Sequence, residues 1–258
     1  MALAYRSKDM GISMPFLDVL NSVALPVKVE VSGLTAYTSV PTGLSREKFF
    51  DKMRGRAADI SGLVDDLLET RAQLDIWVEA PYLDDINLDH SSGAKARAIQ
   101  LFWVDSRGVP CGYVQVSIAG DEREDSNDDD TYIKVLASSL TFDSVYLSKD
   151  LRGLGYGSTI SKAAVSLAMD VWGTALQLYN VAPLPVVLRF KAETESISGW
   201  LVAKSAARAC VGDDHKGNFN DNPDSWLDSG FDAVTDSDIP TGSMVRRGHP
   251  VEFYLEIG

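Results

Sequence analysis

The 258-residue chain is 45% hydrophobic and carries 37 acidic against 24 basic side chains, a net charge of −13. This length and composition fit one large buried core, while the negative charge argues against direct binding of nucleic acid, which relies on Lys and Arg contacts to phosphate. Charged side chains interrupt the N-terminal segment, and no apolar run approaches the roughly 18 residues of a membrane span. We therefore expect neither a secretion signal nor a transmembrane helix.

Cysteine and histidine usage indicates a reducing, cytoplasmic setting without a metal centre. Cys111 and Cys210 are too few for a disulfide framework and are expected to be small buried side chains. The histidines at 90, 215 and 249 show no ligand spacing with the cysteines or with one another. We therefore assign no metal.

Apolar periodicity predicts the elements in chain order. Residues 27–37 favour a strand, and Ser45 is a suitable N-cap for a helix. The β-rich runs 96–104 and 111–119 flank a turn-forming segment (DSRGVP), which predicts a hairpin. Beyond it we predict a strand over 140–147, a helix over 158–172, a strand over 184–191, a helix over 195–210 and a strand over 250–257.

Each of the two C-terminal helices has a predicted buried stripe. In the second, we expect Ile197, Leu201 and Ala209 to face the core. In the first, the stripe consists of Ile160, Ala164, Leu167, Ala168 and Val171, with Lys162 and Asp170 off it.

Residues 145–158 (VYLSKDLRGLGYGS) are the most informative segment, because a short strand leads through a glycine-rich turn into a helix. Alternate glycines bring backbone N–H groups close to a ligand, and a helix N-terminus adds unpaired N–H groups and a positive dipole end. These features predict a phosphate or pyrophosphate ligand. The alternative is a glycine-rich turn that binds nothing.

Two other glycine loops do not match. A dinucleotide fingerprint needs Gly-x-Gly-x-x-Gly, whereas glycines here fall at 153, 155 and 157, and no acidic residue follows about twenty positions on. A Walker A loop needs a lysine before its hydroxyl residue, and Gly157 precedes Ser158 instead.

The spacing Arg152-x-x-Gly155-x-Gly157 resembles the acyl-CoA pyrophosphate loop of the GNAT (N-acetyltransferase) superfamily. The resemblance implies an α/β (α+β) fold: a mixed, mostly antiparallel central sheet, a parallel strand pair at the CoA loop, and helices on both faces. It covers a core over 96–258, in which 226–231 (WLDSGF) looks like the stretch before the family's sixth strand, with Trp in place of Tyr.

The same resemblance implies an N-terminal region over 1–95. Residues 27–37 would be the family's first strand. Residues 45–78 would hold its first two helices, broken near Gly55 or Gly62.

The implied donor is acetyl-CoA. By resemblance, the backbone of Val145 and Leu147 would hydrogen-bond the pantetheine arm. The pyrophosphate would be bound by Arg152, Gly153, Leu154, Gly155, Tyr156, Gly157 and Ser158.

Acyl transfer to an amine needs a base and a donor for the oxyanion, and the departing thiolate can take a proton from an acid. Aligning on the glycine loop puts Thr141 where the family often has a catalytic glutamate, which is a departure. Asp143, two residues on and on the same strand face, is the candidate base, directly or through water; a turn or salt-bridge role is the alternative. The tyrosine that many family members carry on the last helix is missing from 195–210, so Tyr254 is the candidate acid. The alternatives are that Tyr254 is only a core residue and that the CoA thiolate leaves without an acid.

Two segments account for the net charge. Residues 121–130 hold seven acids and one arginine, and residues 213–238 hold eight aspartates and one lysine. Solvated, mobile loops are one interpretation. In the family topology both connections emerge at the sheet end away from the pyrophosphate loop, where they would attract a cationic acceptor such as a polyamine, an aminoglycoside-like amine or a lysine-rich peptide. Residues 144–191 are net +3, which suits polyanionic CoA.

Three functions remain. The first is a CoA-dependent N-acyltransferase that acts on a small-molecule or peptide amine, without membrane or nucleic-acid contact. The second is a GNAT-like module that binds acyl-CoA or a partner without turnover. The third is an interaction protein whose acidic segments mimic a polyanion.

Overall fold

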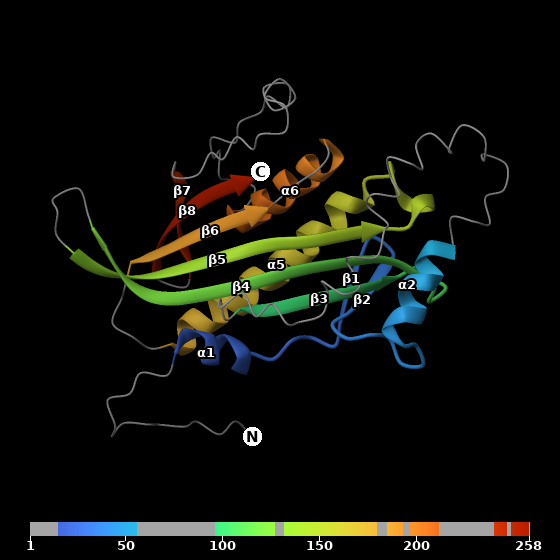
Figure 1. The fold of residues 1–258 in the computed structure, drawn as a ribbon, viewed down its shortest axis with the longest axis horizontal. Helices are drawn as coiled ribbons and strands as arrows, with labels where there is room; N and C mark the ends of the chain where they lie inside the picture. Colours follow the sequence, from blue (N-terminus) through green and yellow to red (C-terminus); the bar gives the residue numbers. More distant parts are fainter. Residues whose placement is uncertain are drawn as a thin grey trace.

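One eight-stranded sheet organises the fold, with strand order β1-β2-β3-β4-β5-β6-β8-β7 (Figure 1). Five of its seven strand pairings are antiparallel, and β5–β6 and β6–β8 are parallel. The mixed, mostly antiparallel α/β class with a parallel pair at the glycine loop is thereby confirmed, and the β6–β8 pair is a second parallel pairing that we did not predict. The computed structural model describes residues 15–55, 96–126, 132–179, 185–192, 197–211, 240–246 and 249–257.

The described chain begins with a short helix that we did not predict, α1 (Phe16–Ser22). Its apolar side chains Phe16, Val19 and Leu20 recur at i, i+3 and i+4, and all three are buried. The signal was present in the sequence, but at seven residues the helix is too short to stand out by periodicity.

Residues 27–37 form a hairpin, so the expected single strand is wrong. β1 (Lys28–Val31) pairs antiparallel with β2 (Leu34–Tyr37). Ser32 and Gly33 between them have φ of 50° and 79°, and positive φ at both central residues is the turn geometry that reverses a chain within two residues. β2 then pairs with β3, so the sheet continues from the N-terminal part into the rest of the chain.

The second helix, α2 (Arg46–Gly55), begins as its sequence indicates. The Lys48 N–H donates to Ser45 Oγ at 3.3 Å, which confirms Ser45 as the N-cap. Gly55, one of the two predicted break points, is the last described residue of this helix, so the predicted break is not tested. The other, Gly62, lies outside the described residues, as does the rest of 45–78.

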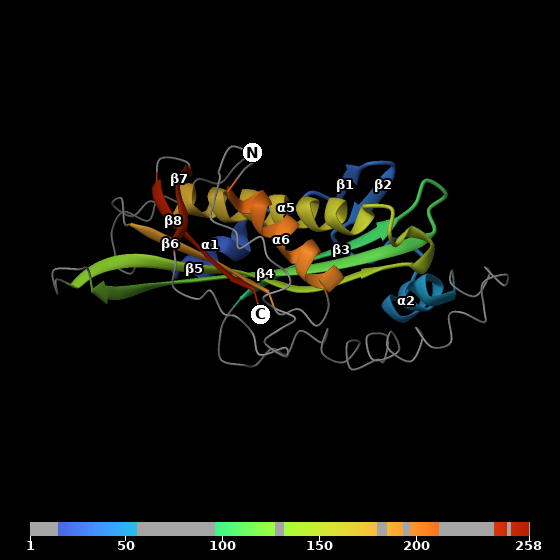
Figure 2. The ribbon, with the colours of Figure 1, turned by 90° about the horizontal axis from the view of Figure 1, so that it is seen from above.

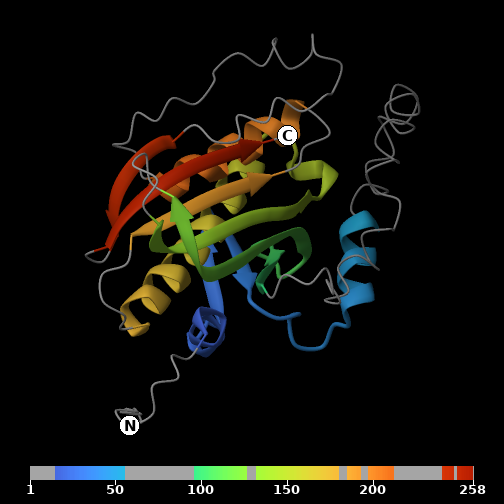
Figure 3. The ribbon, with the colours of Figure 1, turned by 60° about the vertical axis from the view of Figure 1, so that its left-hand side comes forward.

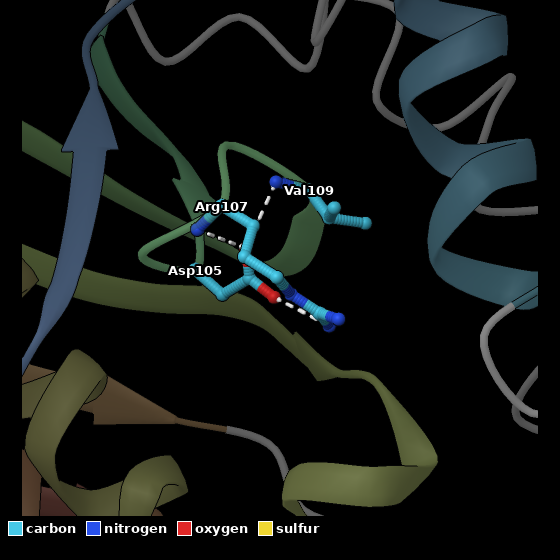
Figure 4. Close-up of polar contacts among 3 residues, drawn as sticks. All are labelled: Asp105, Arg107 and Val109. Atoms are coloured by element: carbon cyan, nitrogen blue, oxygen red, sulfur yellow. Dashed lines mark hydrogen bonds and ion pairs between the residues drawn. The ribbon is translucent and has the colours of Figure 1, made fainter.

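The predicted hairpin of 96–119 is confirmed by β3 (Arg97–Val104) and β4 (Pro110–Ser126). Its turn is organised by Asp105, whose Oδ1 accepts the N–H groups of Arg107 at 2.9 Å and Val109 at 3.0 Å (Figure 4). Gly108 supplies the positive φ of 76° that this turn needs.

β4 and β5 (Tyr132–Leu147) form a long antiparallel pair that projects beyond its neighbours on the left of Figure 1. Pairing runs from Gly112↔Leu147 to Ser126↔Tyr132. The mobile-loop interpretation is therefore wrong for 121–126, because their backbone groups are paired with β5 whatever the charge of their side chains. Residues 127–130, 213–238 and the 226–231 stretch lie outside the described residues.

The C-terminal half follows the β–α–β crossover pattern that joins parallel strands. From β5 the chain passes through a short 3₁₀ turn into a long helix, which returns it to the parallel strand beside β5. The elements are η1 (Lys149–Leu151), α5 (Tyr156–Leu178), β6 (Val186–Ala192), α6 (Ile197–Val211), β7 (Pro240–Arg246) and β8 (His249–Ile257).

The sheet has two unlike faces. The helix-covered face packs against α1, α5 and α6 and is apolar; Val116, Leu140 and Leu188 are among its buried side chains. The opposite face, here called the polar face, carries α2 only at one end, where Phe102 and Tyr113 pack against it. Figures 2 and 3 show α2 and α5 separated by the strands. The remaining described side chains of the polar face include Gln100, Gln115, Ser117, Thr141, Ser144 and Arg189.

The stripe predicted for α5 is confirmed, but the stripe of α6 is partly wrong. In α5 all five predicted positions are buried or half-buried, and both charged positions are exposed. In α6, Leu201 is 54% exposed and Ala209 is half-buried, while the side chain of Ile197 lies outside the description. The buried side chains among the described residues of α6 are three alanines, Lys204 and Cys210. Both cysteines are buried, as expected. No helix of the described ranges has both the length and the apolar character to cross a membrane.

Candidate acyl-CoA and catalytic site

The glycine turn opens helix α5 in the conformation that its glycines allow. Gly153 and Gly155 have φ of 75° and 82°, and Gly155 is the N-cap of the 23-residue helix. A Cβ at either glycine would meet no atom within 4 Å, so the turn faces open space. The first helical bond runs from the Thr159 N–H to the Gly155 carbonyl, which leaves the preceding N–H groups of the first turn without an intrahelical acceptor. The turn therefore presents N–H donors and a positive dipole end to solvent.

Gly157 and Ser158 differ from the other predicted loop residues, because their side-chain positions face α6. A Cβ on Gly157 would lie 3.4 Å from Val202 Cγ2. The Ser158 and Ser205 hydroxyls are hydrogen-bonded to each other. The third glycine thus lets α6 approach the first turn of α5. Only the backbone N–H groups of these two residues remain available to a ligand.

β5 loses one neighbour before it reaches the turn. Its pairing with β6 ends at Phe142↔Ala192, whereas its pairing with β4 continues to Gly112↔Leu147. Beyond Phe142, the β6 side of β5 therefore has no partner strand among the described residues. This opening lies directly before the glycine turn.

The main-chain groups of Val145 and Leu147 point into this opening. The Ser148 N–H donates to the Cys111 carbonyl at 2.8 Å, and antiparallel ladders alternate between bonded and non-bonded pairs. The main-chain N–H and C=O groups of Tyr146 therefore point toward β4, while those of Val145 and Leu147 point away from it. The Leu147 carbonyl agrees with this direction, because it accepts a hydrogen bond from Arg152 Nε at 2.8 Å.

Arg152 is held at the start of the turn by two contacts. Besides the bond to the Leu147 carbonyl, its guanidinium carbon lies 5.4 Å from the centre of the Tyr146 ring. Its charge is thereby fixed beside the N-terminus of α5, where it adds to the positive potential of the turn. The exposed Leu154, at 66% exposure, is the apolar tip of the same turn.

Asp143 occupies a β-bulge at the point where the sheet opens. Gln115 pairs with Ser144 and Val116 pairs with Phe142, so Asp143 is the extra residue of β5. Its Oδ2 accepts Ser117 Oγ at 2.5 Å and Gln115 Nε2 at 3.4 Å, which places the carboxylate on the polar face with Thr141. The expectation that Asp143 and Thr141 share a face is confirmed by these contacts.

Sequence reasoning missed the polar side chains that surround this carboxylate. Tyr113, Gln115 and Ser117 stand at alternate positions of β4, so a period-two polar pattern was present in the sequence. Tyr113 OH donates to Gln115 Oε1 at 2.8 Å, and Arg46 Nη2 lies 3.5 Å from the same phenol oxygen. Burial raises the pKa of the Tyr113 phenol above its ordinary value; Asp143 adds to this shift and Arg46 opposes it.

Tyr254 is not brought to Asp143. In the sheet register it is level with Arg189 and Ser139, two strands from β5, and the Arg189 guanidinium carbon lies 6.0 Å from its ring centre. From strand spacing and rise, its backbone lies roughly 15 Å from that of Asp143. Asp143 therefore lies next to the stretch of β5 that leads into the glycine turn, and Tyr254 lies too far away to contact it.

Comparisons with known proteins add little to this picture. No protein-family model and no curated protein matches the chain. One solved structure, of a tyrosine-to-phenylalanine mutant of the AtaT toxin, is similar at 19% identity over 50% of this chain and 69% of that one, with a TM-score of 0.28. At that score the match carries no weight for fold or function. The architecture itself agrees with the expected fold class: a mixed sheet, a glycine turn after β5, and helices on both faces.

Proposed function

We propose that this protein is an N-acyltransferase that transfers an acetyl group from acetyl-CoA to a primary amine of a cationic acceptor. The observation that carries the proposal is the N–H-lined turn that opens α5, directly after a stretch of β5 whose Val145 and Leu147 main-chain groups face away from β4. This end of β5 offers main-chain donors and acceptors to an extended arm, and the residues that follow it offer N–H groups to a pyrophosphate. The function was expected from the loop, and the direction of these main-chain groups supports it.

The donor fits the residues present. The amide-bearing pantetheine arm would pair with the backbone of Val145 and Leu147, and the pyrophosphate would lie against the N–H groups of 153–158 and near Arg152. When bound, acetyl-CoA supplies the activated acyl group. The chain's own part is to bind the anion, orient the arm, and place the thioester near the bulge.

Asp143 is the group best placed to take the proton of the attacking amine, directly or through water. It is exposed, and it lies at the start of the opening. In the transfer the amine nitrogen forms a bond to the acyl carbon, its proton passes to the carboxylate, and the carbon–sulfur bond breaks with CoA leaving as thiolate.

Calorimetric titration of acetyl-CoA into Gly155→Glu tests the donor site. The variant places a side chain and a negative charge where the pyrophosphate would lie, so we expect binding to weaken by about 100-fold. Gly108→Glu is a matched control, because Gly108 has a similar φ of 76°, equally open surroundings and a place in another turn. Equal affinity of wild type and Gly155→Glu would remove the loop from the proposal.

A second function, acyl-CoA binding without turnover, is favoured by one observation. Neither Thr141 at the glutamate position nor the remote Tyr254 offers an acid beside Asp143. CoA-thiol release from acetyl-CoA with a polyamine or a lysine-rich peptide distinguishes the two. Tight acetyl-CoA binding with no thiol release on any such amine would favour the binding module.

A further inference from the structure

A chain of hydrogen bonds crosses the polar face from α2 to the bulge of β5. Arg46 Nη2 approaches the Tyr113 phenol oxygen at 3.5 Å, and Tyr113 OH donates to Gln115 Oε1 at 2.8 Å. Gln115 Nε2 in turn donates to Asp143 Oδ2 at 3.4 Å. The chain therefore begins at a cation that can only donate and ends at a carboxylate.

The chemistry of each group gives the chain one direction. A guanidinium has no acceptor, so the phenol oxygen of Tyr113 accepts from Arg46 and its single proton goes to Gln115. Gln100 Nε2 is a second donor to the same Gln115 Oε1, at 3.0 Å. With two donors on its oxygen, the Gln115 amide cannot be flipped without setting donor against donor. Its N–H₂ group must face Asp143.

Burial makes this orientation costly to change. Tyr113 is 1% exposed and Gln115 is 4% exposed. A buried polar group left without its partner destabilises the fold, and linked hydrogen bonds in a low-dielectric interior strengthen one another. The aromatic rings of Phe50 and Phe102 pack against Tyr113 with centroids 5.2 Å away, which fixes the phenol in place.

We propose that Gln115 is a positioning residue for Asp143, and that Arg46 and Tyr113 set its amide so that it holds the Asp143 carboxylate as an anion at the bulge. Ser117, on the same Oδ2, is the second donor that fixes the carboxylate. This inference rests on the proposed function, in which that carboxylate accepts the amine proton. It explains why a base could sit on an exposed bulge and still keep one orientation.

The test is a ligand-free titration of the Asp143 carboxyl by ¹³C NMR, with its resonance identified by its loss in Asp143→Asn. Loss of a donor to a carboxylate disfavours its charged form, so Gln115→Met should raise the titration midpoint by about half a pH unit or more. Tyr113→Phe, which removes only a hydroxyl, should raise it less. Among the described residues, four cations lie on the polar face or contact its side chains: Arg46, Arg152, Arg189 and Lys191. All four are present in every variant, so they do not cause a difference in midpoint between variants.

Thr141→Val is the matched control, because it changes a side chain of the same face and strand without touching the chain of hydrogen bonds. It should leave the midpoint unchanged. Gln115→Met should also lower kcat about tenfold while leaving acetyl-CoA affinity unchanged, since it acts through the base and not through the donor site.

A wild-type midpoint in both Gln115→Met and Tyr113→Phe would overturn the inference, and the second variant serves if the first does not fold. Wild-type turnover in Asp143→Asn would remove this carboxylate from the reaction and with it the present inference, whereas no CoA-thiol release by the wild-type protein with any amine tested would overturn the proposed function. The two failures are distinguishable because the titration needs neither acetyl-CoA nor an acceptor.

Discussion

The two ends of β5 show how differently one strand can be used. At its C-terminal end β5 bears the Asp143 bulge and runs into the glycine turn, and beyond Phe142 it has no β6 partner among the described residues. At its N-terminal end, roughly 50 Å away by the usual strand rise, it pairs with the acidic residues 121–126 of β4. The first end offers backbone groups and a positive turn, and the second offers a paired ribbon with negative side chains. Charge in the sequence distinguishes the second end, whereas backbone geometry is the reason that we propose the site at the first.

This separation changes the meaning of the acidic segment. Asp121 pairs with Ala137 and Ser126 pairs with Tyr132, so the described acidic residues begin roughly 20 Å from Asp143 and extend away from it. At physiological salt the Debye length is about 8 Å. These residues can attract a cationic acceptor over a distance, but they cannot contact it at the bulge.

The largest expected effect compares two aspartates of the β4–β5 pair. Asp143→Asn removes the proposed base and should lower kcat by about 100-fold, with the KM for acetyl-CoA within about twofold of wild type. Asp121→Asn makes the same change at the acidic end and should leave kcat unchanged. Steady-state CoA release with a polyamine acceptor measures both. Equal kcat values for the two variants would contradict the proposal that the catalytic carboxylate lies at the C-terminal end of β5.

A smaller effect compares two arginines. Arg152→Met removes the cation fixed beside the turn, so acetyl-CoA should bind about tenfold more weakly in calorimetry. Arg123→Met removes one positive charge from the exposed acidic end and should leave the affinity at its wild-type value. If both variants lost the same affinity, net charge and not the turn would govern donor binding.

Alkaline stability tests the buried phenol near the opening. Because burial raises the pKa of Tyr113 above its ordinary value of 10.0, the unfolded chain releases this proton first, and the stabilisation present below pH 10 is lost as pH rises further. The free energy of unfolding of wild type minus that of Tyr113→Phe should therefore fall by about 1.4 kcal/mol per pH unit above pH 10. Urea unfolding at pH 9 and pH 11 measures this difference. If the difference does not change with pH, the phenol ionises in the folded protein as it does in water.

The smallest effect concerns acceptor attraction. Neutralising Asp121 and Glu124 together should raise the KM of a polyamine by less than about twofold at physiological salt, and somewhat more at low salt. Both side chains are exposed, and Glu122 is left intact because it accepts a hydrogen bond from Tyr179 OH at 2.6 Å. A large rise at physiological salt would place the acceptor much closer to the acidic end than the register allows.

Local patterns predicted much of the fold. The β3–β4 hairpin follows from its turn residues, the α5 stripe from helical periodicity, and the N-cap of α2 from Ser45. The errors came where a local signal was ambiguous: the continuous run 27–37 concealed a two-residue turn, and the charge of 121–126 suggested a loop although backbone pairing does not depend on side-chain charge. The prediction for Leu201 was wrong because its side chain is exposed, whereas the alanines of α6, which carry a weaker apolar signal, are buried.

The sequence by itself determined the glycine turn, because turn, strand and helix start are contiguous and their backbone requirements are local. Only the tertiary structure decided the surroundings of Asp143. The bulge depends on the register between β4 and β5, and the Arg46–Tyr113–Gln115 chain joins residues up to 97 positions apart in sequence. Residues that meet through strand pairing and helix packing carry no shared spacing in the sequence, so Asp143 could be named there as a candidate base, but the side chains that hold it could not.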